Sequence, residues 1–257
     1  MRMNAMIAGV GMTKFGKHMD RGMKSIGAEA VQAAIEDAGL DKADIEAAYV
    51  GNAAAGLVTG QECIRGQVVL RDAGIGRIPV INVENACASA STAFNQAAAM
   101  VSAGCYDVVL ALGVEKLYHE DKRKSFAAFS GAVDVEALVE IKAKLAAQAK
   151  AKGAEAAASG AGEKRSMFMD IYAAGARAYM EKYGATAEDL AGVSAKNSFH
   201  GSMNPRAQFL DVLTVEEVLA APMIAEPLTR PMCSPIGDGA AAAVLVSERK
   251  ARELGLN

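Results

Sequence analysis

Cys87 is the side chain in this sequence best placed to act as a nucleophile. It lies in the segment INVENACASASTAF, where an apolar strand pattern ends near Val83 and a helix of small residues begins at Cys87 or just before it. A thiol at a helix N-terminus faces the positive end of the helix dipole and unpaired backbone amides, which favour the nucleophilic thiolate. The same amides could stabilise an oxyanion when the thiolate attacks a thioester. The alternative is a small buried cysteine that packs the strand–helix junction.

The other cysteines offer no second site. Cys63, Cys105 and Cys233 lie in contexts that predict packing, and no CxxC or paired Cys/His spacing occurs in the sequence. Neither a metal site nor a disulfide framework is therefore expected, and reduced thiols are typical of an intracellular protein.

The histidines do not include an obvious general base for Cys87. We expect His18 and His119 at the surface, and His200 in KNSFHGSMNP either lines a substrate pocket or orders a loop. Asp238 stands between Gly237 and Gly239, a pattern typical of a turn.

Alternating strand and helix patterns position these residues in the first part of the chain. Their order predicts an α/β protein with a mostly parallel sheet that is covered on both faces. The predicted strands are residues 5–10, 45–50, 78–83 and 106–114, and the predicted helices are 23–38, 61–73 and 86–103. The first strand is expected to end at Gly9 and Gly11.

The pattern changes after residue 114. An alanine-rich stretch with several lysines at 137–161 reads either as a solvated helix or as a basic cover over an anionic ligand. Helices are expected at 166–183 and 187–200, then a loop-rich region at 201–238, a buried strand after the turn at 237–239 and a short helix at 248–254.

Composition limits the function classes. The chain has 257 residues, 52% of them hydrophobic, so it can bury a substantial core. Its formal net charge of −3 gives it no overall positive potential that would attract nucleic acid. The opening segment does not read as a signal peptide, and no apolar run is long enough to span a bilayer. We expect a cytoplasmic protein that binds neither nucleic acid nor a membrane.

Four segments, in order along the chain, resemble the sterol-carrier-type members of the thiolase superfamily (acetyl-CoA acetyltransferase-like proteins). They are GVGMTKFG at 9–16, INVENACASASTAF around Cys87, KNSFHGSMNPRAQF at 196–209 and PLTRPMCSPIGDGAAAAVLVSE at 227–248. Ala90 stands where this family usually has glycine after the motif's serine, Ser89.

The resemblance implies a thiolase-like fold, in which the chain supplies the N-terminal βαβαβαββ half with a mixed five-stranded sheet. Residues 1–114 and 236–257 would form this half, and residues 115–235 an α-rich insertion. It also implies acyl transfer from acyl-CoA or 3-ketoacyl-CoA in lipid metabolism, with Cys87 as the covalent nucleophile and coenzyme A as substrate or product. In the matched segments, His200, Asn204 and Arg230 are the candidate substrate-binding residues.

The second half of the family's fold is absent from this sequence. Its His-containing motif and its Gly-rich loop with a second Cys find no match here, so acid and base groups would come from a C-terminal half or a partner subunit. The resemblance also implies a homo-oligomer such as a dimer, which pairs through the strand at 78–83, and admits a small zinc-ribbon/OB-fold partner protein.

Three rival functions stay open. A ketoacyl-synthase-like subunit shares the fold and the cysteine position. A thiolase-like aldolase resembles the pattern, although such aldolases lack the nucleophilic cysteine. A non-catalytic acyl-CoA-binding subunit would explain the missing histidine motifs.

Overall fold

The computed structural model describes residues 3–140, 143–144, 147 and 166–256. Its contacts divide the chain into two compact units, which we call unit 1 (Met1–Glu120 with Gly237–Asn257) and unit 2 (Asp121–Ile236). The alanine-rich stretch predicted at 137–161 lies largely outside the described residues.

Unit 1 is built on a five-stranded sheet in the order β1-β7-β4-β2-β3. Its strands are β1 (Met6–Met12), β2 (Ala47–Gly51), β3 (Val80–Val83), β4 (Val108–Glu115) and β7 (Gly239–Val246). β2 pairs in parallel with β3 and with β4, whereas β7 runs antiparallel to β1 and to β4. The predicted mixed five-stranded sheet is confirmed. Only β7 departs from the parallel strand direction that the alternating pattern predicted.

β7 is antiparallel because no crossover helix of unit 1 separates it from β4. The chain leaves at the end of β4, forms unit 2 and returns directly beside the strand that it left, so that Glu115 pairs with Gly239 and Val108 with Val246. A strand that returns in this way must run in the opposite direction, as in a hairpin.

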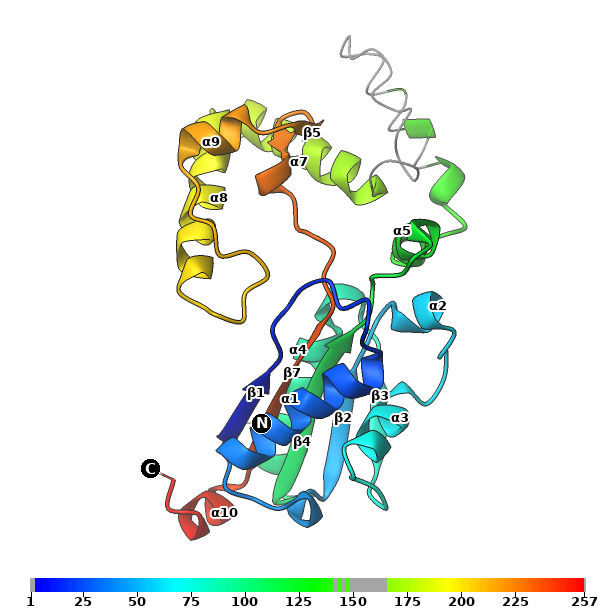
Figure 1. Ribbon diagram of the computed structural model, residues 1–257, viewed down its shortest axis with the longest axis vertical. Helices are drawn as coiled ribbons and strands as arrows, with labels where there is room; N and C mark the ends of the chain where they lie inside the picture. The colour runs from blue at the N-terminus through cyan, green and yellow to red at the C-terminus, as the bar shows by residue number, and fades with distance from the viewer. Residues whose placement is uncertain (1–2, 141–142, 145–146, 148–165, 257) are drawn as a thin grey trace. The chain divides into compact units, whose positions relative to one another are not determined.

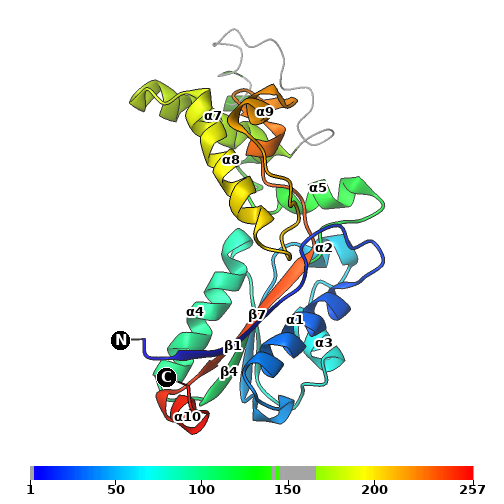
Figure 2. The same ribbon diagram turned by 60° about the vertical axis from the view of Figure 1, so that its left-hand side comes forward.

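Helices cover both faces of this sheet (Figures 1 and 2). One face carries α1 (Met23–Asp37) and α3 (Arg65–Asp72), and the other carries α4 (Ser89–Ser102). Strand residues alternate between two cores, so that Val50 and Leu110 pack on the first side and Tyr49 and Val109 on the second. The shorter elements are η1 (Lys42–Asp44), α2 (Ala55–Thr59), η2 (Ala86–Ala88) and α10 (Glu248–Glu253).

Two predicted boundaries were wrong for local steric reasons. The helix expected at 61–73 begins only at Arg65, as α3, because Ile64 before it adopts a left-handed backbone with φ 50°. The short helix α2 was not predicted, and it ends at Thr59, before Gly60 with φ 84°. The first strand continues through Gly9 and Gly11 to Met12, since these glycines allow the strand to lie against the backbone of α1. A Cβ atom on Gly11 would lie 2.2 Å from the carbonyl oxygen of Ala30.

Unit 2 is mostly helical. It contains α5 (Lys122–Ser130), α7 (Met167–Tyr183), α8 (Ala187–Ser202) and α9 (Val215–Ala220), with a small hairpin of β5 (Met223–Ala225) and β6 (Leu228–Thr229) followed by η4 (Arg230–Met232). The helices predicted at 166–183 and 187–200 are confirmed as α7 and α8. The region expected to be loop-rich contains α9, which begins at a capping box formed by Thr214 and Glu217.

Candidate active site

A strained turn leads from β3 into the helix behind Cys87. Ala86 has a left-handed backbone with φ 45°, which is unfavourable for a residue with a Cβ atom. Two side chains hold this turn. The Glu84 Oε1 atom accepts a 2.6 Å hydrogen bond from the Ala86 amide, and the Ser89 hydroxyl donates a 2.7 Å bond to the Ala86 carbonyl. Both the amide and the carbonyl of Ala86, the residue that precedes Cys87, are therefore held by side-chain hydrogen bonds.

Ser89 is a structural residue of the motif. Its hydroxyl is buried and also accepts a 2.9 Å bond from the Asn85 amide. The Asn85 side chain extends the brace, because its Nδ2 atom donates to the Thr92 hydroxyl at 2.9 Å. The residue types around Cys87 thus build a stable turn, whether or not they take part in chemistry.

Two glycines allow the start of α4 to lie directly on the sheet. A Cβ atom on Gly51, the last residue of β2, would lie 2.6 Å from the backbone of Ser89, and one on Gly113 of β4 would lie 2.5 Å from the Cβ of Ala90. Ala90 occupies the position where the family usually has glycine, and Gly113 provides the space for its methyl group. The turn at Cys87 is therefore held by the sheet as well as by its own hydrogen bonds.

The thiol of Cys87 itself is exposed. It lies in η2, two residues before α4, so the α-helix begins slightly later than the sequence suggested. The alternative interpretation, in which Cys87 packs the junction, is wrong. An exposed thiol flanked by Ala86 and Ala88 at the positive end of a 14-residue helix can be reached by a substrate.

A polar network follows the neighbouring strands at the same carboxyl edge of the sheet. Asn52 comes directly after β2, and its Nδ2 atom donates to the Val114 carbonyl at 2.6 Å and to Glu115 Oε1 at 3.0 Å. Glu115 Oε2 accepts bonds from the amides of Ala53 and Ala54, both at 3.1 Å. The ends of β2 and β4 are thereby joined beside the turn that carries Cys87. Sequence reasoning missed both Asn52 and Glu115.

Asp238 does not lie in the turn that was predicted at 237–239, because it forms an antiparallel bridge with Gly16 directly before β7. Its side chain is fully buried and forms an ion pair with Lys116. A carboxylate with no exposed surface needs a cation or several donors, and a GDG pattern alone does not reveal them.

The candidate substrate-binding residues His200, Asn204 and Arg230 all belong to unit 2 and are exposed. His200 lies in the last turn of α8, and the Asn204 side chain accepts a 3.0 Å bond from the amide of Arg206. Arg230 begins η4, and its amide donates to the Pro222 carbonyl at 2.9 Å. His200 and Asn204 are neighbours in one segment, whereas Cys87 belongs to unit 1. Their part in substrate binding stays a prediction.

The remaining cysteines differ from one another. Cys63 and Cys105 are exposed, so the expectation that they pack in the interior was wrong. Cys233 is half-buried, and burial raises the pKa of its thiol, which disfavours the thiolate. Within the described residues, no group of three or more His, Cys, Asp and Glu side chains could hold a metal ion. The described helices also include none that is long and apolar enough to cross a membrane.

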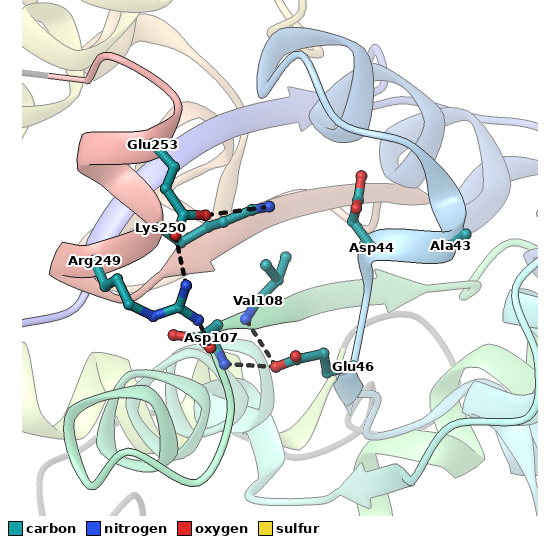
Figure 3. Close-up of a pocket in the computed structure, with 8 residues that line it drawn as sticks. All are labelled: Ala43, Asp44, Glu46, Asp107, Val108, Arg249, Lys250 and Glu253. Carbon is teal, nitrogen blue, oxygen red and sulfur yellow. Dashed lines mark hydrogen bonds and ion pairs between the residues drawn. The ribbon is translucent and has the colours of Figure 1, made fainter.

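A polar cavity of about 260 Å³ lies at the opposite end of β4 from Glu115 (Figure 3). Its charged side chains bind one another, since Arg249 pairs with both Asp107 and Glu253. The Ser247 hydroxyl donates to Asp107 at 2.6 Å and, with the nearby Arg249 guanidinium, lowers the pKa of that carboxyl. The side chains around this cavity therefore join α10 to the start of β4, and the cavity lies away from Cys87.

Comparisons with known proteins agree with this architecture. Residues 5–249 match the family model described as the thiolase N-terminal domain. The chain is 39% identical over 247 residues to an acetyl-CoA acetyltransferase of Methanothermobacter thermautotrophicus, which covers 96% of this chain and 58% of that protein. It is 32% identical over 250 residues to sterol carrier protein 2 of Gallus gallus, covering 96% of this chain and 42% of that protein.

A solved structure shares the fold over almost the whole chain. The Ltp2-ChsH2(DUF35) aldolase superposes with a TM-score of 0.69 at 30% sequence identity, covering 97% of this chain and 57% of that one. The chain thus spans about half the length of the relatives that it matches. The family match extends over nearly all of the described fold, and the chain belongs to the thiolase family, in the part that corresponds to its N-terminal domain.

Proposed function

We propose that this chain is the N-terminal half of a thiolase-type acyltransferase that acts on acyl-CoA and 3-ketoacyl-CoA thioesters. Residues 1–114 and 236–257 form its half-domain, and residues 115–235 are the insertion. The observation that carries the proposal is the exposed thiol of Cys87 on a braced turn at the start of α4, in a chain that matches the thiolase family from residue 5 to residue 249.

The proposed chemistry begins with attack of the Cys87 thiolate on a carbonyl carbon, which is the thioester carbonyl of an acyl-CoA or the 3-keto carbonyl of a 3-ketoacyl-CoA. A new carbon–sulfur bond forms at Cys87, the bond to the CoA sulfur or to the α-carbon breaks, and the acyl group stays on the enzyme. Amides at the helix start stabilise the oxyanion of the tetrahedral intermediate. In degradation CoA then removes the acyl group, whereas in synthesis a second acyl-CoA accepts it.

The proton transfers of this reaction are assigned to another part of the assembly. Cleavage or formation of the carbon–carbon bond needs a base and an acid near the α-carbon, and the matched segments of this chain contribute no histidine for that role. A C-terminal half or a partner subunit would supply these groups, and His200, Asn204 and Arg230 would contact the CoA substrate. We place this chemistry in cytoplasmic lipid metabolism.

Two exposed apolar side chains on one side of the sheet support assembly with a second half or a second copy. Phe94 lies on α4 with 36% of its surface exposed, and Val10 of β1 is 57% exposed on the same side of the sheet, since its neighbours Gly9 and Gly11 face α1. Exposed apolar patches commonly mark interfaces. A dimer and a zinc-ribbon/OB-fold partner both belong to this proposal, and the two-part name of the similar Ltp2-ChsH2(DUF35) aldolase makes the second worth testing.

The test is mass spectrometry after incubation with acetyl-CoA or acetoacetyl-CoA, with and without the polypeptide that carries the second half. We expect one acyl group on the peptide that contains Cys87. Cys87→Ala should remove the acyl group and all thiolysis while leaving the unfolding midpoint unchanged. Cys63→Ala, which alters another exposed thiol, is the matched control and should behave as the unaltered chain.

The isolated chain should be acylated slowly and should not turn over, since loss of a general acid or base commonly costs ~10²–10⁴ in rate. Multiple turnover by the isolated chain would contradict the assignment of the proton transfers to a second half. Thiolysis that survives in Cys87→Ala would remove Cys87 from the mechanism.

A second candidate is a thiolase-like aldolase, which the structural similarity to the Ltp2-ChsH2(DUF35) aldolase favours. A retro-aldol reaction on a CoA-linked β-hydroxyacyl chain needs no covalent acyl-cysteine. Cleavage of such a substrate at the same rate by Cys87→Ala and by the unaltered assembly, without acylation, would support this candidate and reject the acyltransferase.

A further inference from the structure

The carboxylate of Asp238 binds four donors from two other segments of unit 1. Its Oδ1 atom accepts hydrogen bonds from the amides of Leu117 and Tyr118, at 2.7 and 2.9 Å. Its Oδ2 atom accepts from the Lys116 Nζ atom at 2.5 Å and from the His18 amide at 3.2 Å. Since Asp238 is fully buried, all of this binding occurs away from water.

The cation of this group is also nearly buried. The Lys116 side chain is 9% exposed, and its ammonium group donates a second bond, of 2.7 Å, to the His18 carbonyl. The Asp238 amide donates to the Gly16 carbonyl at 2.8 Å, and the Gly16 amide donates to the Asp238 carbonyl at 3.0 Å. We call Asp238, Lys116 and the backbone groups of His18, Leu117 and Tyr118 the clasp.

The clasp lies where the chain leaves unit 1 and where it returns to unit 1. The chain passes from unit 1 to unit 2 after Glu120 and returns at Gly237. Residues 116–118 lie just before the first passage, and Asp238 lies just after the second. One carboxylate therefore holds the outgoing segment, the returning segment and the segment that follows β1.

We infer that Asp238 is a positioning residue that fixes both passages between the two units, so that the insertion begins and ends at one rigid point. In the transfer reaction proposed above, on which this part of the inference rests, the clasp acts on substrate binding through unit 2. It does not touch the reacting atoms. Loss of the clasp should then raise KM for acyl-CoA and leave the intrinsic reactivity of the Cys87 thiol unchanged.

The first test is amide hydrogen exchange of the unaltered assembly and of Asp238→Asn. The substitution removes the negative charge and places an NH₂ group opposite one pair of donors, so the buried ammonium of Lys116 loses its counter-charge and the segments at His18 and 116–118 are no longer held together. The amides of His18, Leu117 and Tyr118 should exchange at least about tenfold faster, whereas the amides in the middle of β4 should keep their protection.

Asp107→Asn is the matched control. Asp107 precedes β4 and is also paired with a cation, Arg249, but at the other end of the strand. It should leave exchange at Leu117 and Tyr118 unchanged. Equal loss of protection in both variants, or faster exchange throughout the sheet in Asp238→Asn, would show a general loss of stability and overturn the inference.

Two measurements keep the inference falsifiable if Asp238→Asn does not fold. In the unaltered protein, Leu117 and Tyr118 must themselves be protected, and exchange at the rate of an open loop would refute the clasp. Lys116→Met keeps the two amide bonds to Oδ1, so exchange should accelerate at His18 more than at Leu117. The opposite order would contradict the proposed geometry.

The kinetic test compares KM for acyl-CoA with the rate at which iodoacetamide alkylates Cys87. We expect a rise in KM of about tenfold in Asp238→Asn, with alkylation unchanged within about twofold. An unchanged KM, or a parallel fall in alkylation, would reject the positioning role. If no variant is acylated, the proposed function fails, while the exchange data still decide whether the clasp exists.

Discussion

Gly113 should be intolerant of even one added methyl group, because of a single neighbour. An ideal Cβ atom at this position lies 2.5 Å from the Cβ of Ala90, whereas its next neighbours, the Ala90 Cα and the Ala241 carbonyl oxygen, are at 3.6 and 3.9 Å. Ordinary contact begins near 3.4 Å. Gly113→Ala must therefore push the start of α4 away from the sheet by roughly 1 Å, and overpacking of this kind costs ~1–3 kcal/mol.

The same displacement should affect the chemistry, since Ala90 lies three residues after Cys87. A misplacement of about 1 Å can cost ~10²-fold in rate. We expect Gly113→Ala to unfold at a lower urea concentration and to lower the rate of Cys87 acylation by one to two orders of magnitude.

Ala90→Gly provides the decisive comparison, because it removes the only atom in severe overlap. Alone it should cost ~0.5–1 kcal/mol as a glycine in a helix. Combined with Gly113→Ala it should restore most of the stability and of the acylation rate, with a coupling energy of ~1–3 kcal/mol in the double-mutant cycle. Gly76→Ala is the matched control, since nothing lies within 4 Å of its added Cβ.

Two results would refute this reasoning. Gly113→Ala with the unfolding midpoint of the unaltered chain would show that α4 adjusts without cost. Failure of Ala90→Gly to rescue it would show that the harm arises elsewhere.

Three further predictions concern reactivity, pH and helix capping. Iodoacetamide near neutral pH should label Cys87 before the other thiols and Cys233 late, because burial raises the pKa of Cys233; equal rates would contradict this. The pKa of Asp107 is lowered below 3.8, so its stabilisation is present above that pH and is lost as the pH falls below it; the stability difference between the unaltered chain and Asp107→Asn, measured in urea from pH 7 to pH 3, should therefore shrink in acid. Thr214→Ala removes the cap of α9 and should lower the free energy of unfolding, measured by calorimetry, by ~0.5–2 kcal/mol. An unchanged value would contradict this role of Thr214.

The strands and long helices could be predicted because the residue pattern that specifies each of them lies within the element itself. Buried strands such as β4 are continuous apolar runs, and α1 shows helical spacing that ends before Gly39. The direction of β7 could not be read in this way, because it depends on where the chain returns after unit 2. The confirmed βαβαβαββ order came from the family resemblance and not from periodicity.

For the candidate site, the sequence identified Cys87 as the candidate residue but not the groups that hold its turn. Cys87 stands out because its motif is continuous. Asn52, Glu115 and Lys116 come from strand ends far apart in the chain, and only the paired sheet brings their side chains together. Asp238 was misread because a carboxylate between two glycines has the same local pattern whether it faces water or a buried lysine.

The return of β7 beside β4 makes unit 2, in topological terms, the loop of a β-hairpin. A change in the length of such a loop alters the closure entropy only slightly, since each doubling of loop length costs only ~0.6 kcal/mol. Evolution could therefore lengthen, shorten or exchange this loop while the register between Glu115 and Gly239 stays the same. We expect grafts from relatives, joined after Tyr118 and before Gly237, to retain the sheet and, in the transfer reaction proposed above, to change substrate preference without altering the turn at Cys87.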